Sequence, residues 1–240
     1  MIIHHPEILQ ENGEIRVSAR IEIADSVGEY PDRLWFRFPE QCIGYVTDRS
    51  DGFAVALLPL AMALGEDMQV RGEVSPRLAL GIREYQRIQT TWHPKRLRTI
   101  GTEYETLAGM RPSDVRGGVA TAFSGGVDSF HTLQAHLHHE PIADYRISHC
   151  LMINGFDFNN DDIEDVRTFN RIARLYQPML RDAGAELLVS HTNITPFLTR
   201  VLRVWHFHGY VHAAFLSATA LVLGRLLKCF FIPSSDCYSA

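Results

Sequence analysis

The chain shows two patterns of hydrophobic and polar positions, one before and one after about residue 118. From residue 118 onward, short apolar runs alternate with longer stretches in which apolar residues recur every three or four positions. The runs predict four strands, at 119–123, 147–153, 186–190 and 229–233. The longer stretches predict three helices, at 129–138, 161–183 and 211–227. Strands that alternate with helices in this way are typical of an α/β domain, in which a parallel sheet is flanked by helices.

The first 112 residues show a more mixed pattern. Their alternating and apolar segments predict strands at 14–23, 34–38, 69–73 and 97–102. An apolar helix is predicted at 53–64, and Ser75-Pro76 marks the start of a second helix that runs to about residue 89. The turn-forming residues of 111–118 then predict a boundary. We therefore expect an N-terminal α+β region at 1–112, which carries no recognisable chemical motif, and an α/β domain at 113–240.

The most informative local sequence is Ser124-Gly125-Gly126-Val127-Asp128-Ser129, which lies between a predicted strand and a predicted helix. A glycine pair at such a junction allows a sharp turn and a close approach of the backbone to a ligand. The free N–H groups at the start of the helix favour phosphate, and the two serines add hydroxyl donors. Because Asp128 would repel phosphate unless a cation lay between them, the motif also predicts Mg²⁺.

The motif is not a Walker A loop, because it lacks the lysine of G-x-x-x-x-G-K-[ST]. It resembles the S-G-G-x-D-S signature of the PP-loop ATP pyrophosphatases, the adenine nucleotide alpha-hydrolase superfamily, and looks closest to the 7-cyano-7-deazaguanine synthase-like branch. The resemblance covers the chain from Val119 onward and implies an α/β fold of the HUP type. It also implies an enzyme that uses Mg·ATP to adenylate a carboxylate or carbonyl oxygen. Such an enzyme releases pyrophosphate and lets a nucleophile displace AMP.

The same resemblance implies a set of site residues. Phe123 and the motif residues Ser124, Gly125, Gly126, Val127, Asp128 and Ser129 would bind the nucleotide. Asp128 would hold the metal and would act in catalysis with Ser124 and Ser129. Ile153 and Asn154 would line the nucleotide pocket, although Asn154-Gly155 is equally well interpreted as a plain turn. Ser234 and Ser235 would form a second turn of small residues close to the phosphates.

Several features limit how far the resemblance extends. The relatives carry a cysteine-ligated zinc, whereas the cysteines here (Cys42, Cys150, Cys229 and Cys237) form no cluster, so we do not predict nitrile formation. Two alternatives stay open, namely a tRNA-modifying thiolase or lysidine-type ligase and a nucleotide-binding regulatory module without turnover. The tRNA class predicts a basic patch, which the net charge of −5 does not favour, so we expect a small carboxylate or carbonyl substrate rather than a nucleic acid.

Other polar residues near the predicted strand ends have competing interpretations. The acidic cluster at 157–162 would either help to hold Mg²⁺ or, as we favour, cap the following helix. His191 follows the third strand of the domain and would either touch a ligand or have no role. His208 and His212 have the i, i+4 spacing of metal ligands on a helix, but the acidic partner of a zincin motif is missing.

Composition adds expectations about location and assembly. The start of the chain lacks a signal peptide, no apolar run is long enough to span a bilayer, and the cysteine usage fits a reducing compartment, so we expect a cytoplasmic protein. The chain stops at Ala240, soon after the fourth predicted strand of the domain. Either it is truncated, or the N-terminal region or a partner chain completes the site. A bare sheet edge favours a homodimer.

Overall fold

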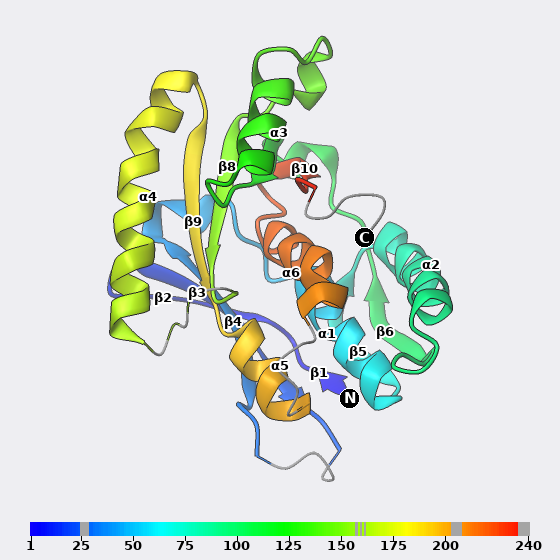
Figure 1. Cartoon of the computed structure of the whole chain (residues 1–240). Coiled ribbons are helices and arrows are strands. Elements are labelled where there is room, and N and C mark those ends of the chain that lie inside the picture. The colour runs from blue at the N-terminus through cyan, green and yellow to red at the C-terminus, as the bar shows by residue number, and fades with distance from the viewer. Residues whose placement is uncertain (25–28, 157, 159, 161, 203–207, 235–240) are drawn as a thin grey trace.

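The computed structural model describes residues 1–24, 29–156, 158, 160, 162–202 and 208–234, with the backbone alone for 208–210. Within these residues, ten strands form one mixed sheet with helices on both faces (Figure 1). The strand order is β10-β7-β8-β9-β4-β3-β1-β5-β6, and β2 pairs with β3. The α/β prediction is therefore confirmed at the level of a sheet flanked by helices.

The strands fall into a parallel group and a mixed group. The parallel group is β10 (Leu227–Phe231), β7 (Gly118–Ala122), β8 (His149–Asn154) and β9 (Glu186–Thr192). The antiparallel strands that follow are β4 (Arg33–Pro39), β3 (Glu14–Glu22) and β2 (Glu7–Glu11). Beyond them lie β1 (Ile2–Ile3), which is antiparallel to β3, and then β5 (Met68–Val74) and β6 (Thr102–Leu107), in parallel pairing.

Six α-helices and three short 3₁₀ helices are present in the described residues. The α-helices are α1 (Asp51–Leu64), α2 (Pro76–Trp92), α3 (Val127–Leu137), α4 (Ile163–Ala183), α5 (Ile194–Leu202) and α6 (His208–Val222). The 3₁₀ helices are η2 (Glu40–Gly44), η3 (Pro112–Asp114) and η4 (Ala143–Tyr145). None of the helices in the described ranges has the length and hydropathy required to cross a membrane.

The core lies on both faces of the sheet, because neighbouring side chains of a strand point to opposite sides. Along β8, Cys150 and Met152 belong to a cluster that α3 and α4 cover, whereas Leu151 belongs to a larger cluster that includes α1, α5 and α6. On the second face, α1 approaches α6 closely at Gly52. A Cβ atom there would lie 2.7 Å from the carbonyl oxygen of Ala218.

One sheet joins the two regions predicted on either side of residue 112, because β4 of the N-terminal region pairs with β9 of the C-terminal half. Only two residue pairs join these strands, Phe36 with Thr192 and Arg37 with His191. The side chain of Asn193 extends the junction, accepting a hydrogen bond from the Trp35 amide at 2.9 Å and donating one to the Arg33 carbonyl at 2.9 Å. The N-terminal region thus packs on the C-terminal half of the same chain. Strand β10 remains at the edge of the sheet.

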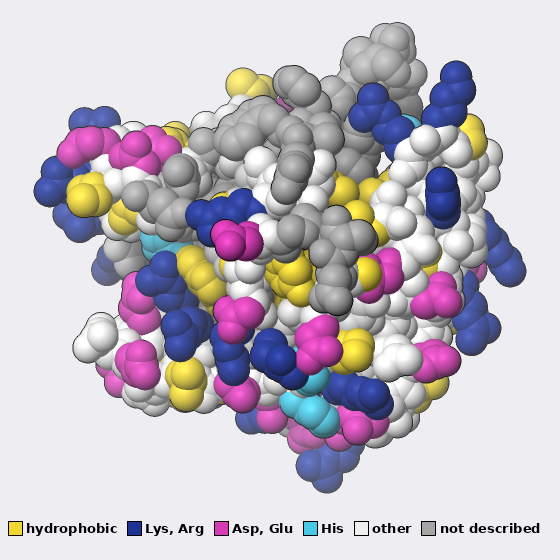
Figure 2. Space-filling model, turned by 90° about the horizontal axis from the view of Figure 1, so that it is seen from below, with side chains coloured by type: hydrophobic (Ala, Val, Ile, Leu, Met, Phe, Trp, Pro, Cys, Tyr) yellow, Lys and Arg dark blue, Asp and Glu magenta, His cyan; other side chains and the backbone are white. Residues whose placement is uncertain are grey.

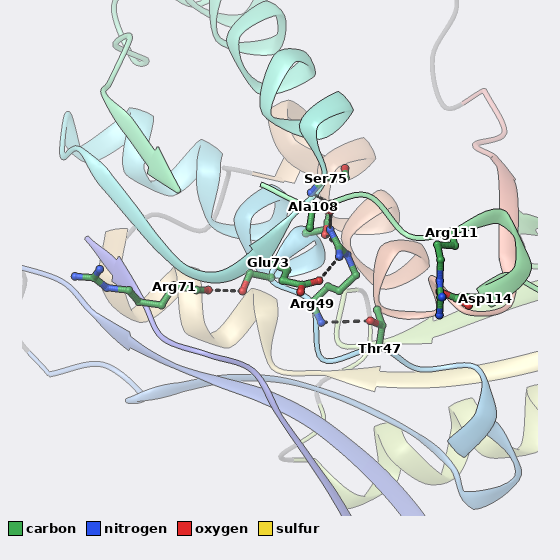
Figure 3. A network of polar contacts seen from close by, with 10 residues as sticks. Thr47, Arg49, Arg71, Glu73, Ser75, Ala108, Arg111 and Asp114 are labelled. Atoms are coloured by element: carbon green, nitrogen blue, oxygen red, sulfur yellow. Dashed lines mark hydrogen bonds and ion pairs between the residues drawn. The ribbon is translucent and has the colours of Figure 1, made fainter. Parts of the chain in front are cut away.

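A buried arginine ties the end of β6 to α1 and β5 (Figure 3). Arg49 donates from Nε to Asp51 Oδ2 at 3.0 Å and from Nη1 to Glu73 Oε2 at 2.6 Å, and its Nη2 donates to the carbonyl of Ala108. The second oxygen of Asp51 accepts from the Ser75 amide at 2.9 Å. This network sets the position of the segment that leads from the N-terminal region to β7.

The predicted elements are largely present, with corrections at the less regular segments. The predicted strand at 97–102 is wrong, because β6 begins at Thr102. The apolar residues Leu97 and Ile100, on which that prediction rested, are buried in an irregular segment. The predicted helix at 211–227 ends earlier, at Val222, and a turn then leads to β10. Strands β1 and β2 and helix α5 were not predicted.

Candidate functional site

The glycine loop joins β7 to α3 at the carboxyl edge of the parallel strands, as predicted. Gly125 has φ +80°, a conformation that residues with a side chain rarely adopt. A Cβ atom at this position would also lie 2.5 Å from the hydroxyl oxygen of Tyr176, which belongs to α4. Glycine is therefore required at position 125 by the packing of the loop on α4, whether or not a ligand binds.

Gly126 is the N-cap of α3, with φ −80° and ψ 169°. Its amide donates to Ser124 Oγ at 3.3 Å, and its carbonyl accepts from Ser129 Oγ at 2.8 Å. The hydroxyl hydrogen of Ser129 is thus used within the loop, and this side chain is buried. The first-turn amides of α3 have no carbonyl within the helix to bond, so they are available to an anion.

A cavity of about 280 Å³ opens beside this loop. Its lining comes from the loop, the end of β8, α4, α6 and the segment after β10: Ala122, Phe123, Ser124, Gly126, Asp128, Ser129, Leu151, Met152, Ile153, Phe156, Phe158, Phe169, Ile172, His212, Leu216, Pro233 and Ser234. The loop and Ser234 contribute polar groups, whereas β8, α4 and α6 contribute mainly apolar side chains. A cavity with a few polar groups in an apolar wall is typical of small-molecule sites.

The structure brings together most of the residues predicted for the site. The predicted residues that line the cavity are Phe123, Ser124, Gly126, Asp128, Ser129, Ile153 and Ser234. Gly125 shapes the loop without lining the cavity. Val127 is 84% exposed, and its side chain is not part of the lining. Asn154 is fully buried and is also absent from the lining. Ser235 lies outside the described residues.

Asn154 belongs instead to a polar cluster that joins the ends of β8 and β9. Its Nδ2 lies 3.2 Å from His191 Nδ1, which in turn lies 3.2 Å from Asn160 Oδ1. The amide of Asn160 donates to the Thr192 carbonyl at 2.6 Å. Burial lowers the pKa of His191, and the nearby Arg37 lowers it further, so the imidazole is neutral at pH 7. His191 therefore holds the strand ends together and does not line the cavity.

The aromatic part of the lining was not predicted as part of the site. Phe156 and Phe158 follow β8, and Phe169 on α4 packs edge-on against Phe158 with the ring centroids 6.0 Å apart. Phe169 did appear in the helical periodicity, but that pattern indicates only a buried face. The imidazole of His212 also lines the cavity, with its ring 6.0 Å from that of Phe156.

The residues present fit a magnesium ion that is held mainly by the phosphates of a bound nucleotide and by water. Within the described ranges, no group of three or more His, Cys, Asp or Glu side chains could hold a metal. Mg²⁺ is usually bound by one or two carboxylates together with phosphate oxygens and water, so a single exposed Asp128 at the helix start is adequate. Asp162 of the acidic cluster caps α4 instead, accepting from the Glu164 amide at 2.8 Å.

The surface charges give no continuous basic field on the face that Figure 2 shows. There, Lys and Arg side chains are interspersed with Asp and Glu among the described residues. A nucleic-acid partner is favoured by basic residues gathered on one face.

Comparisons of the chain with protein-family models, with curated proteins and with solved structures gave no match.

Proposed function

We propose that the chain is an enzyme that binds Mg·ATP at the glycine loop and transfers the adenylyl group to a carboxylate or carbonyl oxygen. The observation that carries the proposal is the cavity at the start of α3. Seven residues predicted from the motif and its neighbouring strand ends line it, although Ser234 lies more than 100 positions from the loop. The same proposal assigns the parallel strands to the HUP type of α/β fold.

The geometry supplies distinct roles for the loop residues. The first-turn amides of α3 would donate to phosphate oxygens, and the helix dipole would favour their negative charge. Asp128 would hold Mg²⁺, and the bound ion would in turn hold the phosphate oxygens beside this carboxylate. Ser124 is exposed and lines the cavity, so its hydroxyl would contact the nucleotide directly. Ser129 would act indirectly, by fixing the Gly126 carbonyl.

The proposed reaction breaks the bond between Pα and the oxygen that bridges to Pβ. The acceptor oxygen forms the new bond to Pα, and pyrophosphate leaves with the bridging oxygen. A nucleophile then attacks the activated carbon and releases AMP. This order of steps and the small carboxylate or carbonyl substrate follow from the resemblance, whereas the preference against nucleic acid follows from the net charge of −5. The homodimer and the cytoplasmic location stay predictions.

Binding is best tested at Gly126. Its φ of −80° is open to any residue, and a Cβ atom there would meet only Ser124 Oγ, at 3.3 Å. Gly126→Val therefore adds a side chain to the cavity lining while the backbone keeps its conformation. We expect calorimetry to show at least a tenfold loss of Mg·ATP affinity, which corresponds to about 1.4 kcal/mol.

Val127→Ala is the matched control, because that side chain lies outside the cavity lining. If Gly126→Val binds Mg·ATP as tightly as the wild type, or if the wild type binds none, the proposed site is wrong. Gly125→Val is less informative, since it would disturb the packing of the loop on α4 in any case.

The reaction class is tested by the products formed from Mg·ATP in the presence of a mixture of small carboxylic acids. We expect AMP and pyrophosphate from the wild type and none from Asp128→Asn, which removes the charge that holds the metal but keeps the shape of the side chain. ADP and phosphate would contradict adenylyl transfer. Tight binding with no products would favour the regulatory module.

A further inference from the structure

The charges around the cavity are unevenly distributed. Among the described lining residues, only two side chains ionise, Asp128 on α3 and His212 on α6. No lysine or arginine lines this part of the cavity. Phosphate sites are commonly built with such cations, which neutralise the bound phosphates.

The following inference rests on the proposed function. ATP with one Mg²⁺ ion still carries a net negative charge of roughly two, while a helix N-terminus is equivalent to only about half a positive charge. Asp128 adds one more negative charge at the same end of the cavity. The described lining therefore needs a further positive charge when the nucleotide is bound, and His212 is the one side chain in it that can supply this charge.

We propose that His212, in its protonated form, contacts the phosphates of the bound nucleotide and makes binding at this site proton-linked. The side chain is exposed at the cavity wall, so it can take a proton from solvent without burial of the charge. Its ring lies 6.0 Å from that of Phe156, and both side chains line the same cavity as the glycine loop. The imidazole thus belongs to the wall of the cavity into which a nucleotide bound at α3 would extend.

Among the described side chains that line the cavity from α3, β8, α4 and the segment after β10, Asp128 is the only ionisable one. On α6, the described residues one turn further along are Phe215 and Leu216, which do not titrate. Further ionisable residues near the lining in sequence fall outside the described side chains: Asp157, Asp161, Arg203, His206, His208, Tyr210, Asp236, Cys237 and Tyr238.

The sign of the linkage follows from this contact. A phosphate beside the imidazole favours its charged form, so binding of the nucleotide is accompanied by uptake of a proton. Binding is therefore strengthened as the pH falls. One exposed ion pair contributes up to about 1 kcal/mol, which corresponds to about fivefold in affinity.

The test measures binding of the Mg²⁺ complex of α,β-methylene-ATP, which cannot be cleaved between Pα and Pβ. Calorimetry compares the wild type, His212→Gln and the control His131→Gln between pH 6 and pH 8. His131 is an exposed histidine on α3 that does not line the cavity. Repeating the titrations in buffers of different ionisation enthalpy gives the number of protons taken up on binding.

We expect His212→Gln to bind about fivefold more weakly than the wild type at pH 6 and about equally at pH 8. We also expect its proton uptake to be reduced, with His131→Gln behaving as the wild type. The titration of the nucleotide's own phosphate is common to all three proteins and cancels in the comparison. If His212→Gln and the wild type share the same pH dependence and proton uptake, the inference is wrong while the proposed function stands. If the wild type does not bind at any pH, both are wrong.

Discussion

Replacing Arg49 with methionine is expected to destabilise the protein by about 3 kcal/mol, at the lower end of the range for breaking a buried ion pair. Arg49 is 8% exposed and Asp51 is 5% exposed. In the described part of the chain, Arg49 is the only cation in contact with Asp51. Methionine fills most of the volume of the arginine stem but provides no charge. The variant therefore leaves a carboxylate buried without its partner.

The other contacts of Arg49 explain why the lower end of the range applies. The side chain of Glu73 is 56% exposed, so solvent screens this second ion pair and its loss costs little. Asp51 keeps the Ser75 amide as a donor after the substitution. The carbonyl of Ala108 loses one donor, which is worth about 1 kcal/mol. The main cost is thus the uncompensated charge on Asp51.

Urea denaturation monitored by circular dichroism measures this cost. With a slope of about 3 kcal/mol per molar urea, a loss of 3 kcal/mol lowers the midpoint by about 1 M. Arg111→Met is the matched control, because the Arg111–Asp114 pair in Figure 3 is a surface contact in which the arginine is 82% exposed. We expect its effect to stay below about 0.5 kcal/mol.

Equal midpoints for Arg49→Met and Arg111→Met would refute the reasoning that burial makes the difference. If Arg49→Met does not fold, Asp51→Asn provides the same test from the other partner. It keeps an acceptor for the Ser75 amide but removes the negative charge that Arg49 neutralises. A fully stable Asp51→Asn protein would contradict the expected cost.

Three further predictions concern stability. Gly81→Ala should stabilise the protein by up to about 1 kcal/mol, because a Cβ atom at this position in α2 meets nothing within 4 Å. Gly52→Ala should destabilise it, because the added Cβ atom would push α1 away from α6. The urea midpoints of the two variants test both predictions. Burial lowers the pKa of His149 and of His191, so the unfolded chain binds more protons than the folded protein, and the urea midpoint should fall as the pH is lowered from 6.5 to 5. The double variant His149→Asn/His191→Asn should show a smaller fall, and the same dependence of the midpoint on pH in both proteins would contradict this. Gly125→Ala should lower the thermal midpoint by several degrees, and an unchanged value would show that the loop relaxes without strain.

The elements with a strong local pattern were predictable from the sequence. The apolar run and glycine pair predicted β7, the loop and α3. The helix predicted at 161–183 also ends where α4 ends, before Gly184, whose φ is +96°. Strand β2 was missed because its residues, Glu-Ile-Leu-Gln-Glu, are mostly exposed and polar. Helix α5 begins within two residues of Pro196, which reads as a break although a first-turn proline fits a helix.

Long-range pairing had no local signal at all. The sequence predicted an N-terminal region that completes the site or leaves this to a partner chain, but nothing in β4 indicates that it pairs with β9. Likewise, Ile153 and Ser234 were assigned to the site through the family resemblance, and neither carries a local signal that would bring it to the loop. The positions of Phe156, Phe158 and His212 depend on how the intervening segments fold over the carboxyl edge of the parallel strands. The strand order was therefore not predictable, whereas the position of the loop between β7 and α3 was.

The junction between β4 and β9 has a consequence for synthesis on the ribosome. The Trp35 amide and its partner Asn193 are 158 positions apart in the chain. At 5 to 20 residues per second, the edge of β4 emerges roughly 8 to 30 s before the residues that cover it. During that interval the buried side chains of Leu34, Phe36 and Phe38 lack much of their final packing. Nascent chains should accordingly depend on chaperone binding to this strand until β9 has been made.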